Sequence, residues 1–271
     1  MPADLSLTAR GPALDLSRFA PVDLCEVVDH AAMLTRVDRK YLVDAATAAA
    51  FLARLPDAYR LLHVDGRPAT TYSSVYFDTA AMDACRDHVQ RRRRRWKVRS
   101  RLYVEDRLCR VEVKTRDGRG VTVKTVADST PLRHGRLDGP EGDFVATTLD
   151  AAGLPLDARA LRQTMEVDYR RSTLADTGRG SRVTLDRGVE CRHAGGRVRL
   201  DDGFVLIETK GAARPSDADR VLGTLGARPR SFSKYASAAS LLRADIADND
   251  VRRLCGRELH AVRAESLGTS A

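Results

Sequence analysis

Alternation of polar and apolar residues, repeated along most of the chain, is the feature that most constrains its fold. A period of two residues is typical of β-strands that bury one face only. Turn-forming GRG, DG and GG sequences separate the alternating segments. Because the connections are short, the pattern favours an antiparallel barrel or a strongly curved sheet over alternating strand–helix units. The predicted strands cover residues 70–78, 95–104, 109–115, 120–126, 164–171, 181–187 and 203–210.

Helical segments interrupt these strands at four places. Asp44 and Ser216 are placed as N-caps, because short polar side chains accept hydrogen bonds from the first turn of a helix. Gly153 and Pro155 end another helix. The fold class is therefore predicted to be α+β, an antiparallel β-barrel with flanking helices. The predicted helices cover residues 45–55, 143–152, 217–225 and 236–246.

Both ends of the chain have the composition of tails. Residues 1–20 carry Pro, Gly and small polar residues without periodicity, and residues 247–271 are charged and end in SLGTSA. The folded domain is predicted to cover residues 21–246. The longest apolar run, residues 45–55, is shorter than the roughly 18 residues of a membrane span. We therefore expect no membrane span in this chain.

The charge balance favours anionic partners. Lys and Arg number 46 against 37 Asp and Glu, which gives a net charge of +9. This excess alone does not separate nucleic acid, membrane surface and phosphate as partners. Five cysteines occur without a CxxC pair or a Cys/His cluster. Neither a zinc site nor a disulfide framework is indicated, and a reduced cytoplasmic location is expected.

One predicted strand indicates where the positive charge is concentrated. In RWKVRSRLYV, residues 95–104, cations occupy every second position and mostly apolar residues lie between them. One face of this strand is thus cationic and the other largely apolar. A solvated outer face would explain one such strand taken alone. The cationic positions are Arg95, Lys97, Arg99 and Arg101.

Four further strands repeat the division into one charged and one apolar face. If the apolar faces pack against helices, the charged faces line either bulk water or the interior of the barrel. Like charges on neighbouring strands destabilise a sheet, and an interior anion would relieve that repulsion. Phosphates accept bidentate contacts from Arg and point-charge contacts from Lys. The pattern therefore predicts a cavity that binds a chain-like polyanion. The polar positions are Glu112 and Lys114, Thr122 and Lys124, Arg182, Thr184 and Asp186, and Glu208 and Lys210.

Three carboxylates, Glu112, Glu166 and Glu208, are predicted on the same faces. They could hold a divalent ion that also binds substrate phosphates, or form salt bridges inside the barrel. The run from Arg91 to Arg94 is interpreted as a solvated turn. The motifs GxxxxGK[ST], GxGxxG, GxSxG and HExxH are absent.

Nine short segments taken in order resemble the VTC domain, the polyphosphate polymerase member of the CYTH-like triphosphate tunnel metalloenzyme superfamily. The likeness spans about residues 25–240. The segments are RVDRKYLVD, SSVYFDT, WKVRSRLY, CRVEVKT, VTVKT, VDYRR, SRVTLDR, VLIETK and SFSKY.

This resemblance implies an antiparallel triphosphate tunnel with named ligands. Glu208 would bind a divalent cation, Mn²⁺ or Mg²⁺. Tyr169, Lys210 and Lys97 are further candidates of lower rank. Asp38 stands where the family usually has Glu, which leaves any metal-binding role of that position open. The implied phosphate ligands are Lys40, Arg99, Arg101, Lys114, Lys124, Arg171, Arg182 and Lys234, and the first three would carry catalysis.

The resemblance implies a phosphotransferase that moves the γ-phosphate of ATP or another triphosphate onto inorganic polyphosphate. A metal-dependent triphosphatase differs only in using water as the acceptor. A non-catalytic polyphosphate-binding protein is a third interpretation. Nucleic-acid binding is disfavoured because only 5% of residues are aromatic, whereas single-strand binders stack bases on aromatic rings. Any export of polyphosphate would need a separate membrane partner.

Overall fold

The computed structural model describes residues 11–29, 37–154 and 156–264. Within these ranges the chain forms two compact units. Unit 1 comprises the described residues up to Thr71, residues 169–189 and residues 200–232, and unit 2 comprises residues 72–168, 190–199 and 233 onward. Arg36 and Pro155, which the sequence analysis used, lie outside the described residues. The single domain of residues 21–246 and its two tails stay a prediction.

Unit 1 is built on strands in the hydrogen-bonded order β1–β3–β8–β9–β11–β2. β1 pairs with β3 in parallel, whereas β3 with β8, β9 with β11 and β11 with β2 are antiparallel. The two longest strands, β8 and β9, continue into unit 2. The bounds are β1 Pro21–Asp23, β2 Val37–Asp44, β3 Arg60–His63, β8 Arg162–Asp176, β9 Ser181–His193 and β11 Phe204–Gly211.

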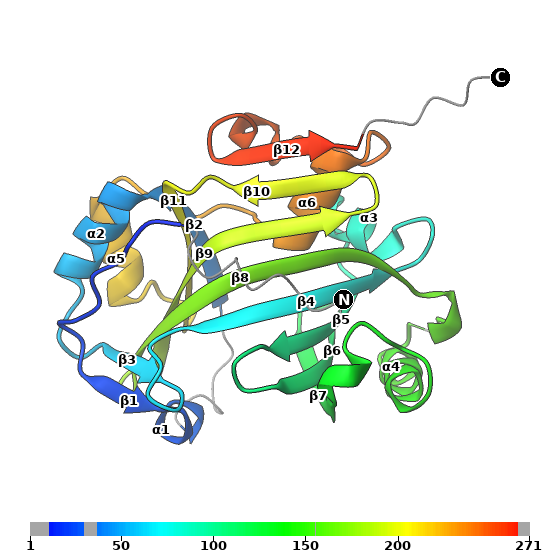
Figure 1. Cartoon of the computed structure of the whole chain (residues 1–271), viewed down its shortest axis with the longest axis horizontal. Coiled ribbons are helices and arrows are strands. Elements are labelled where there is room, and N and C mark those ends of the chain that lie inside the picture. Colours follow the sequence, from blue (N-terminus) through cyan, green and yellow to red (C-terminus); the bar gives the residue numbers. More distant parts are fainter. Residues whose placement is uncertain (1–10, 30–36, 155, 265–271) are drawn as a thin grey trace. The chain divides into compact units, whose positions relative to one another are not determined.

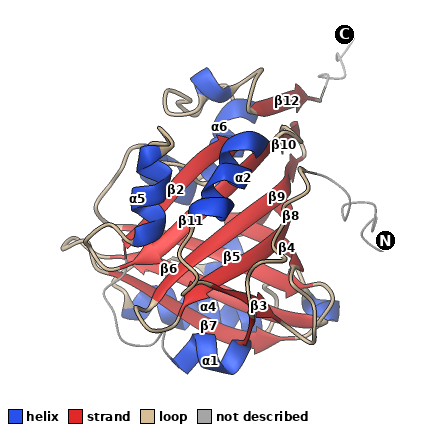
Figure 2. Cartoon of the chain, turned by 90° about the vertical axis from the view of Figure 1, so that its left-hand side faces the viewer, coloured by secondary structure: helices blue, strands red, loops and turns tan. Residues whose placement is uncertain are grey.

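Three helices belong to unit 1: α1 (Leu24–Asp29), α2 (Ala45–Arg54) and α5 (Asp217–Thr224). The predicted N-caps are confirmed, because the Asp44 carboxylate accepts from the Thr47 amide and Ser216 forms a capping box with Asp219. In Figures 1 and 2, α2 and α5 lie side by side next to β2 and β11.

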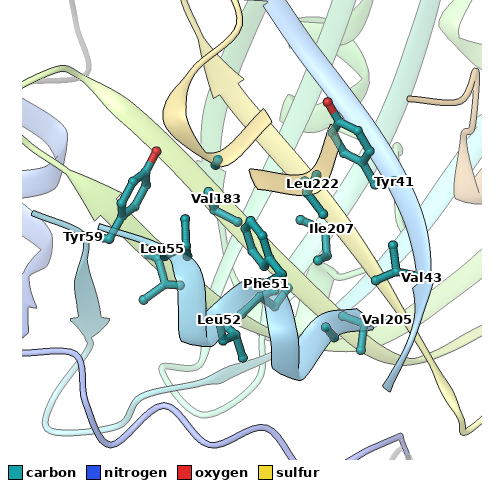
Figure 3. Packing of buried hydrophobic residues seen from close by; sticks show 14 of the residues in the cluster. Tyr41, Val43, Phe51, Leu52, Leu55, Tyr59, Val183, Val205, Ile207 and Leu222 are labelled. Atoms are coloured by element: carbon teal, nitrogen blue, oxygen red, sulfur yellow. The ribbon is translucent and has the colours of Figure 1, made fainter. Parts of the chain in front are cut away.

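The core of unit 1 fills the space between these helices and the sheet. Phe51 of α2 and Leu222 of α5 contact apolar side chains from the odd-numbered positions of β2, β9 and β11 (Figure 3). Because side chains alternate along a strand, the even-numbered positions must lie on the opposite face. The buried strand residues are Tyr41, Val43, Val183, Leu185, Val205 and Ile207.

Unit 2 contains strands in the order β12–β10–β9–β8–β4–β5–β6–β7. Its helices are α3 (Asp83–Val89), α4 (Pro140–Ala151) and α6 (Lys234–Leu242), and its 3₁₀ turns are η2 (Pro131–Arg133), η3 (Ala158–Ala160) and η4 (Arg252–Leu254). The remaining strand bounds are β4 Thr70–Asp78, β5 Arg95–Tyr103, β6 Leu108–Arg116, β7 Thr122–Ser129, β10 Gly196–Leu200 and β12 Leu259–Arg263.

The apolar face of β5 and β6 packs against α4. Val98, Val111 and Val113 have no exposed surface and form one cluster with Val145 and Leu149 of α4. The charged positions of the two strands therefore occupy the face opposite α4. This burial fixes the register of the strands, because a slip by one residue would turn the charged side chains into the core.

All seven predicted strands are confirmed, and the fold is α+β with a mostly antiparallel sheet. The closed barrel is not confirmed. Among the described strands, β7 pairs only with β6 and β2 only with β11, so hydrogen bonds do not close a ring. Alternation predicts which face of a strand is buried, but it does not say which strands pair. Within the described residues, no helix combines the length and apolarity needed to cross a bilayer.

Other differences concern helix ends and one strand face. Helix α6 begins earlier than predicted because Ser233 is its N-cap, and α4 begins at Pro140, which suits the first turn of a helix. Val121 and Val123 were predicted on a buried face. Val121, just before β7, and Val123 on β7 are more than half exposed, so this face of the strand is not part of a core.

Candidate functional site

A row of three lysines crosses the charged face of unit 2. Lys97 on β5 lies directly opposite Lys114 on β6, and Lys114 lies directly opposite Lys124 on β7. Like charges at directly opposite positions destabilise antiparallel strands. The row therefore concentrates positive charge at one level of this face.

Glu112 is the buried counter-charge next to this lysine row. Its side chain is 3% exposed and accepts a hydrogen bond from Arg99 Nε at 2.6 Å. Lys124 Nζ lies 2.7 Å from its Oε1, and Arg101 Nη1 lies 4.0 Å from its Oε2. Burial alone would raise the pKa of Glu112, but these three cations outweigh burial and hold it well below its usual value. Glu112 thus forms the salt bridges that the sequence analysis gave as one of its two roles.

Tyr76 adds a hydroxyl to the same face, which sequence reasoning did not anticipate. Tyr76 on β4 lies opposite Arg99 on β5, and the Tyr76 hydroxyl accepts a hydrogen bond from Arg99 Nη1 at 2.9 Å. Burial raises the pKa of this phenol, yet Arg99, Arg101 and Lys234 together lower it below the usual value. The segment YFD offered one signal, because Tyr76 shares its parity with the polar residue Ser74.

The start of α6 is held against this face by buried tyrosines. Tyr235 stacks on Tyr76 with ring centroids 4.9 Å apart, and its hydroxyl donates to Asp78 at 2.6 Å. Lys97 Nζ donates to the Ser233 hydroxyl at 2.9 Å. These contacts place Lys234, the first residue of α6, near the cations of β5.

The even-numbered positions of β2, β9 and β11 form a second charged face, in unit 1. Glu208 on β11 lies between Lys40 on β2 and Thr184 on β9. One row along, Lys210 lies between Asp38 and Arg182. Acidic and basic side chains are therefore mixed on this face, although Lys210 and Arg182 are also directly opposite each other.

Two cations of the unit 1 face, Lys210 and Arg171, form ion pairs with acidic side chains. Lys210 Nζ donates to Glu208 Oε1 at 2.8 Å and lies 3.6 Å from Asp38. Arg171 donates to both oxygens of the fully buried Asp186 at 2.6 and 2.8 Å, and its Nη2 is 3.9 Å from Glu208. Burial would raise the pKa of Glu208, but Lys210, Lys40 and Arg171 keep it well below the usual value.

The remaining predicted residues of unit 1 lie on or beside this face. Lys40 Nζ donates to the Phe232 carbonyl at 2.9 Å, and Arg182 donates to the Val27 carbonyl at 3.1 Å. The guanidinium of Arg171 lies over the Tyr169 ring, 5.2 Å from its centroid. Each unit thus groups its share of the predicted ligands. Unit 1 brings together Lys40, Tyr169, Arg171, Arg182, Glu208 and Lys210, and unit 2 brings together Arg99, Arg101, Lys114, Lys124 and Lys234.

Two predicted features lie apart from these faces. Glu166 is half exposed and pairs with Arg192, which also binds Asp168 and Glu190. Glu166 therefore pairs with Arg192, which is not one of the predicted phosphate ligands. Arg91 to Arg94 are exposed in the turn before β5, as predicted.

The donor groups present limit how a divalent metal could bind. Within the described part of the chain, no three His, Cys, Asp or Glu side chains gather as a metal site. Mg²⁺ and Mn²⁺ accept oxygen ligands, and Mg²⁺ often uses one or two carboxylates with waters and substrate phosphates. Glu208 fits that arrangement as one carboxylate of the unit 1 face, which also carries Asp38 and Asp186.

Likenesses to solved structures are distant. A protein from Hippeastrum, described as a candidate adenylyl cyclase with a dominant triphosphatase activity, is 16% identical with a TM-score of 0.46, covering 79% of this chain and 97% of its own. A candidate adenylate cyclase from Bacillus halodurans is 14% identical with a TM-score of 0.43, covering 71% and 90%. No curated protein matches the chain.

A family model gives the firmer result. The model of the VTC domain matches residues 35–243, which is more than half of the chain and contains both charged faces. The matched range includes every predicted ligand from Lys40 to Lys234. The chain therefore belongs to the VTC domain family.

Proposed function

We propose that the protein transfers the γ-phosphoryl group of a nucleoside triphosphate to the end of an inorganic polyphosphate chain. The observation that carries this proposal is the row of Lys97, Lys114 and Lys124, which lie at directly opposite positions on three strands. Membership of the VTC domain family supports it. A linear polyanion would neutralise the row and remove the repulsion between its members.

In the proposed reaction, a terminal oxygen of the polyphosphate attacks the γ-phosphorus in line. The bond from the γ-phosphorus to its bridging oxygen breaks, and the nucleoside diphosphate leaves. Phosphoryl transfer of this kind needs positioning and charge stabilisation more than a protein nucleophile. Arg99 and Arg101 stabilise the charge on the transferring group on the face of unit 2. The family resemblance implies a catalytic role for Lys40 as well.

Neighbouring residues keep these groups in place. Glu112 and Tyr76 orient the Arg99 guanidinium through the hydrogen bonds described above. Lys114, Lys124, Arg182, Lys210 and Lys234 bind phosphate oxygens, with Tyr169 and Arg171 beside them. Glu208 would hold Mg²⁺ or Mn²⁺, which would neutralise phosphate charge when bound.

The test is incubation of the purified protein with ATP and Mn²⁺ or Mg²⁺, followed by gel electrophoresis for acid-labile chains. Chains that lengthen with time, with release of ADP, support the proposal. Release of free phosphate without chains would replace it with a triphosphatase. Binding of polyphosphate without turnover would make the protein a non-catalytic binder. Glu208→Gln removes the metal carboxylate, and the exposed Glu105→Gln is its matched control.

A further inference from the structure

The strand register continues the cationic face of unit 2 beyond the lysine row. Arg95 on β5 lies directly opposite Arg116 on β6, two residues along each strand from Lys97 and Lys114. Positions two apart share a face and are about 7 Å apart. The arginine pair is therefore the next row of the same cationic face.

Neither arginine has an acidic partner among the described residues. One Arg95 Nη1 hydrogen donates to the Arg92 carbonyl at 2.7 Å, which leaves the charge uncompensated. The Nε of Arg116 is buried and has no hydrogen-bond partner within the described structure. Burial and the neighbouring Arg116 lower the pKa of Arg95. Two half-buried guanidinium groups are thus opposed without a counter-charge.

The acid that follows Arg116 in the sequence has a structural role in a turn. Asp117 follows Arg116, but its Oδ1 accepts from the amides of Arg119 and Val121 at 2.9 and 2.8 Å and so shapes the β6–β7 turn. The other end of the face differs. There Arg110, opposite Arg101, pairs with Asp128 at 2.9 Å. The row of Arg101 and Arg110 therefore includes a carboxylate, whereas the row of Arg95 and Arg116, at the other end of the same strands, has none.

We infer that Arg95 and Arg116 form an additional oxyanion subsite, adjoining the lysine row, for a linear polyphosphate longer than a triphosphate. Two guanidinium groups can bind the oxygens of one phosphoryl unit through paired hydrogen bonds. The inference rests on the proposed function, since it extends the phosphate path assigned to the lysine row. It also predicts that the protein binds long polyphosphate more tightly than triphosphate. A triphosphatase would not need this preference, because a triphosphate held at the lysine row does not require the additional row.

The experiment compares two ligands on three proteins by isothermal titration calorimetry. The ligands are tripolyphosphate and a size-fractionated linear polyphosphate several times longer. The proteins are the wild type, the double variant R95Q/R116Q and the control R107Q/R159Q. The control removes the same charge from two exposed arginines of unit 2 that lie off this face.

We expect R95Q/R116Q to lose about tenfold or more in affinity for the long chain, which corresponds to one or two charge-assisted hydrogen bonds. Its affinity for tripolyphosphate should change much less, and the control should change little with either ligand. Equal losses for both ligands, or a loss in the control as large as in R95Q/R116Q, would overturn the subsite.

Two outcomes separate this inference from the proposed function. If the wild type binds neither ligand, the proposed function fails. If it binds both and R95Q/R116Q behaves like the wild type, only the subsite fails. Melting of the ligand-free proteins serves as the folding check. Removing two opposed charges should leave the melting temperature of R95Q/R116Q equal to or above that of the wild type.

Discussion

The two charged faces use similar residues but balance their charges differently. On the unit 1 face, Lys210 and Arg171 pair with Glu208 and Asp186, so two of its cations have a counter-charge without a ligand. On the unit 2 face, the lysine row has one buried carboxylate beside it, Glu112. The difference is one of arrangement: the unit 1 face has carboxylates among its cations, whereas the lysine row places three cations at directly opposite positions.

Glu112→Gln should have the largest effect on stability. It leaves Arg99, Arg101 and Lys124 clustered without their counter-charge, and removing one partner of a buried ion pair costs about 3–5 kcal/mol. Urea denaturation of the ligand-free protein measures this loss, and added polyphosphate should restore part of it. Glu105→Gln, at an exposed position in the β5–β6 turn, is the control. A ligand-free stability equal to that of the wild type would contradict the assignment of Glu112 as the counter-charge.

Arg99→Gln should have the next largest effect, on activity. Loss of one group that stabilises transition-state charge costs about 2–4 kcal/mol, or roughly a thirtyfold to a thousandfold loss in kcat. Steady-state ATP turnover measures the change, with Arg107→Gln as the control. If Arg99→Gln raised KM and left kcat unchanged, Arg99 would bind substrate without favouring the transition state.

Acid should destabilise the protein through Glu112 and Glu208. Both carboxyl pKa values are lowered in the folded protein by neighbouring cations that outweigh burial. Their stabilising contribution is therefore fully present above the unfolded-state value of 4.5 and is lost as pH falls below it. Unfolding free energies measured from neutral to acid pH should fall less steeply for Glu112→Gln than for the wild type. Parallel curves would show that Glu112 is not linked to acid unfolding.

Lys114→Gln should have the smallest effect on stability. The sign of its effect should be opposite to that of Lys210→Gln on the other face. Removing the middle charge of the lysine row should stabilise the ligand-free protein by about 0.2–1 kcal/mol, while weakening polyphosphate binding. Lys210→Gln in unit 1 should instead destabilise the protein, because Glu208 would lose its closest cation. Thermal melting and calorimetric titration of both variants make the comparison. Destabilisation by both substitutions would mean that unit 2 is compensated as fully as unit 1.

Sequence reasoning predicted the faces well because burial depends on local alternation. Trp96 and Val98 are buried as expected, and Lys97, Arg99 and Arg101 share the other face. Helix α3 was missed because its N-cap is Met82, which has a positive φ and makes no capping hydrogen bond, so the usual start signal is absent.

Contacts between distant segments could not be predicted in the same way. The stacking of Tyr235 on Tyr76 and the opposition of Arg95 and Arg116 depend on strand pairing and loop geometry, which alternation does not encode. The role of Glu112 stayed open for a related reason. A carboxylate on a cationic face has the same sequence pattern whether it pairs with cations or binds metal.

The long strands β8 and β9 limit how this chain can change its length. Each supplies residues to both units, and their shared turn covers residues 177–180. One residue inserted within β8 would move the side chains on one side of the insertion to the opposite face of the sheet. Such a shift could move Arg171 to the apolar face. An insertion in the turn would move none of these side chains. We therefore expect natural relatives to differ in length at this turn and to keep a constant residue count within the two strands.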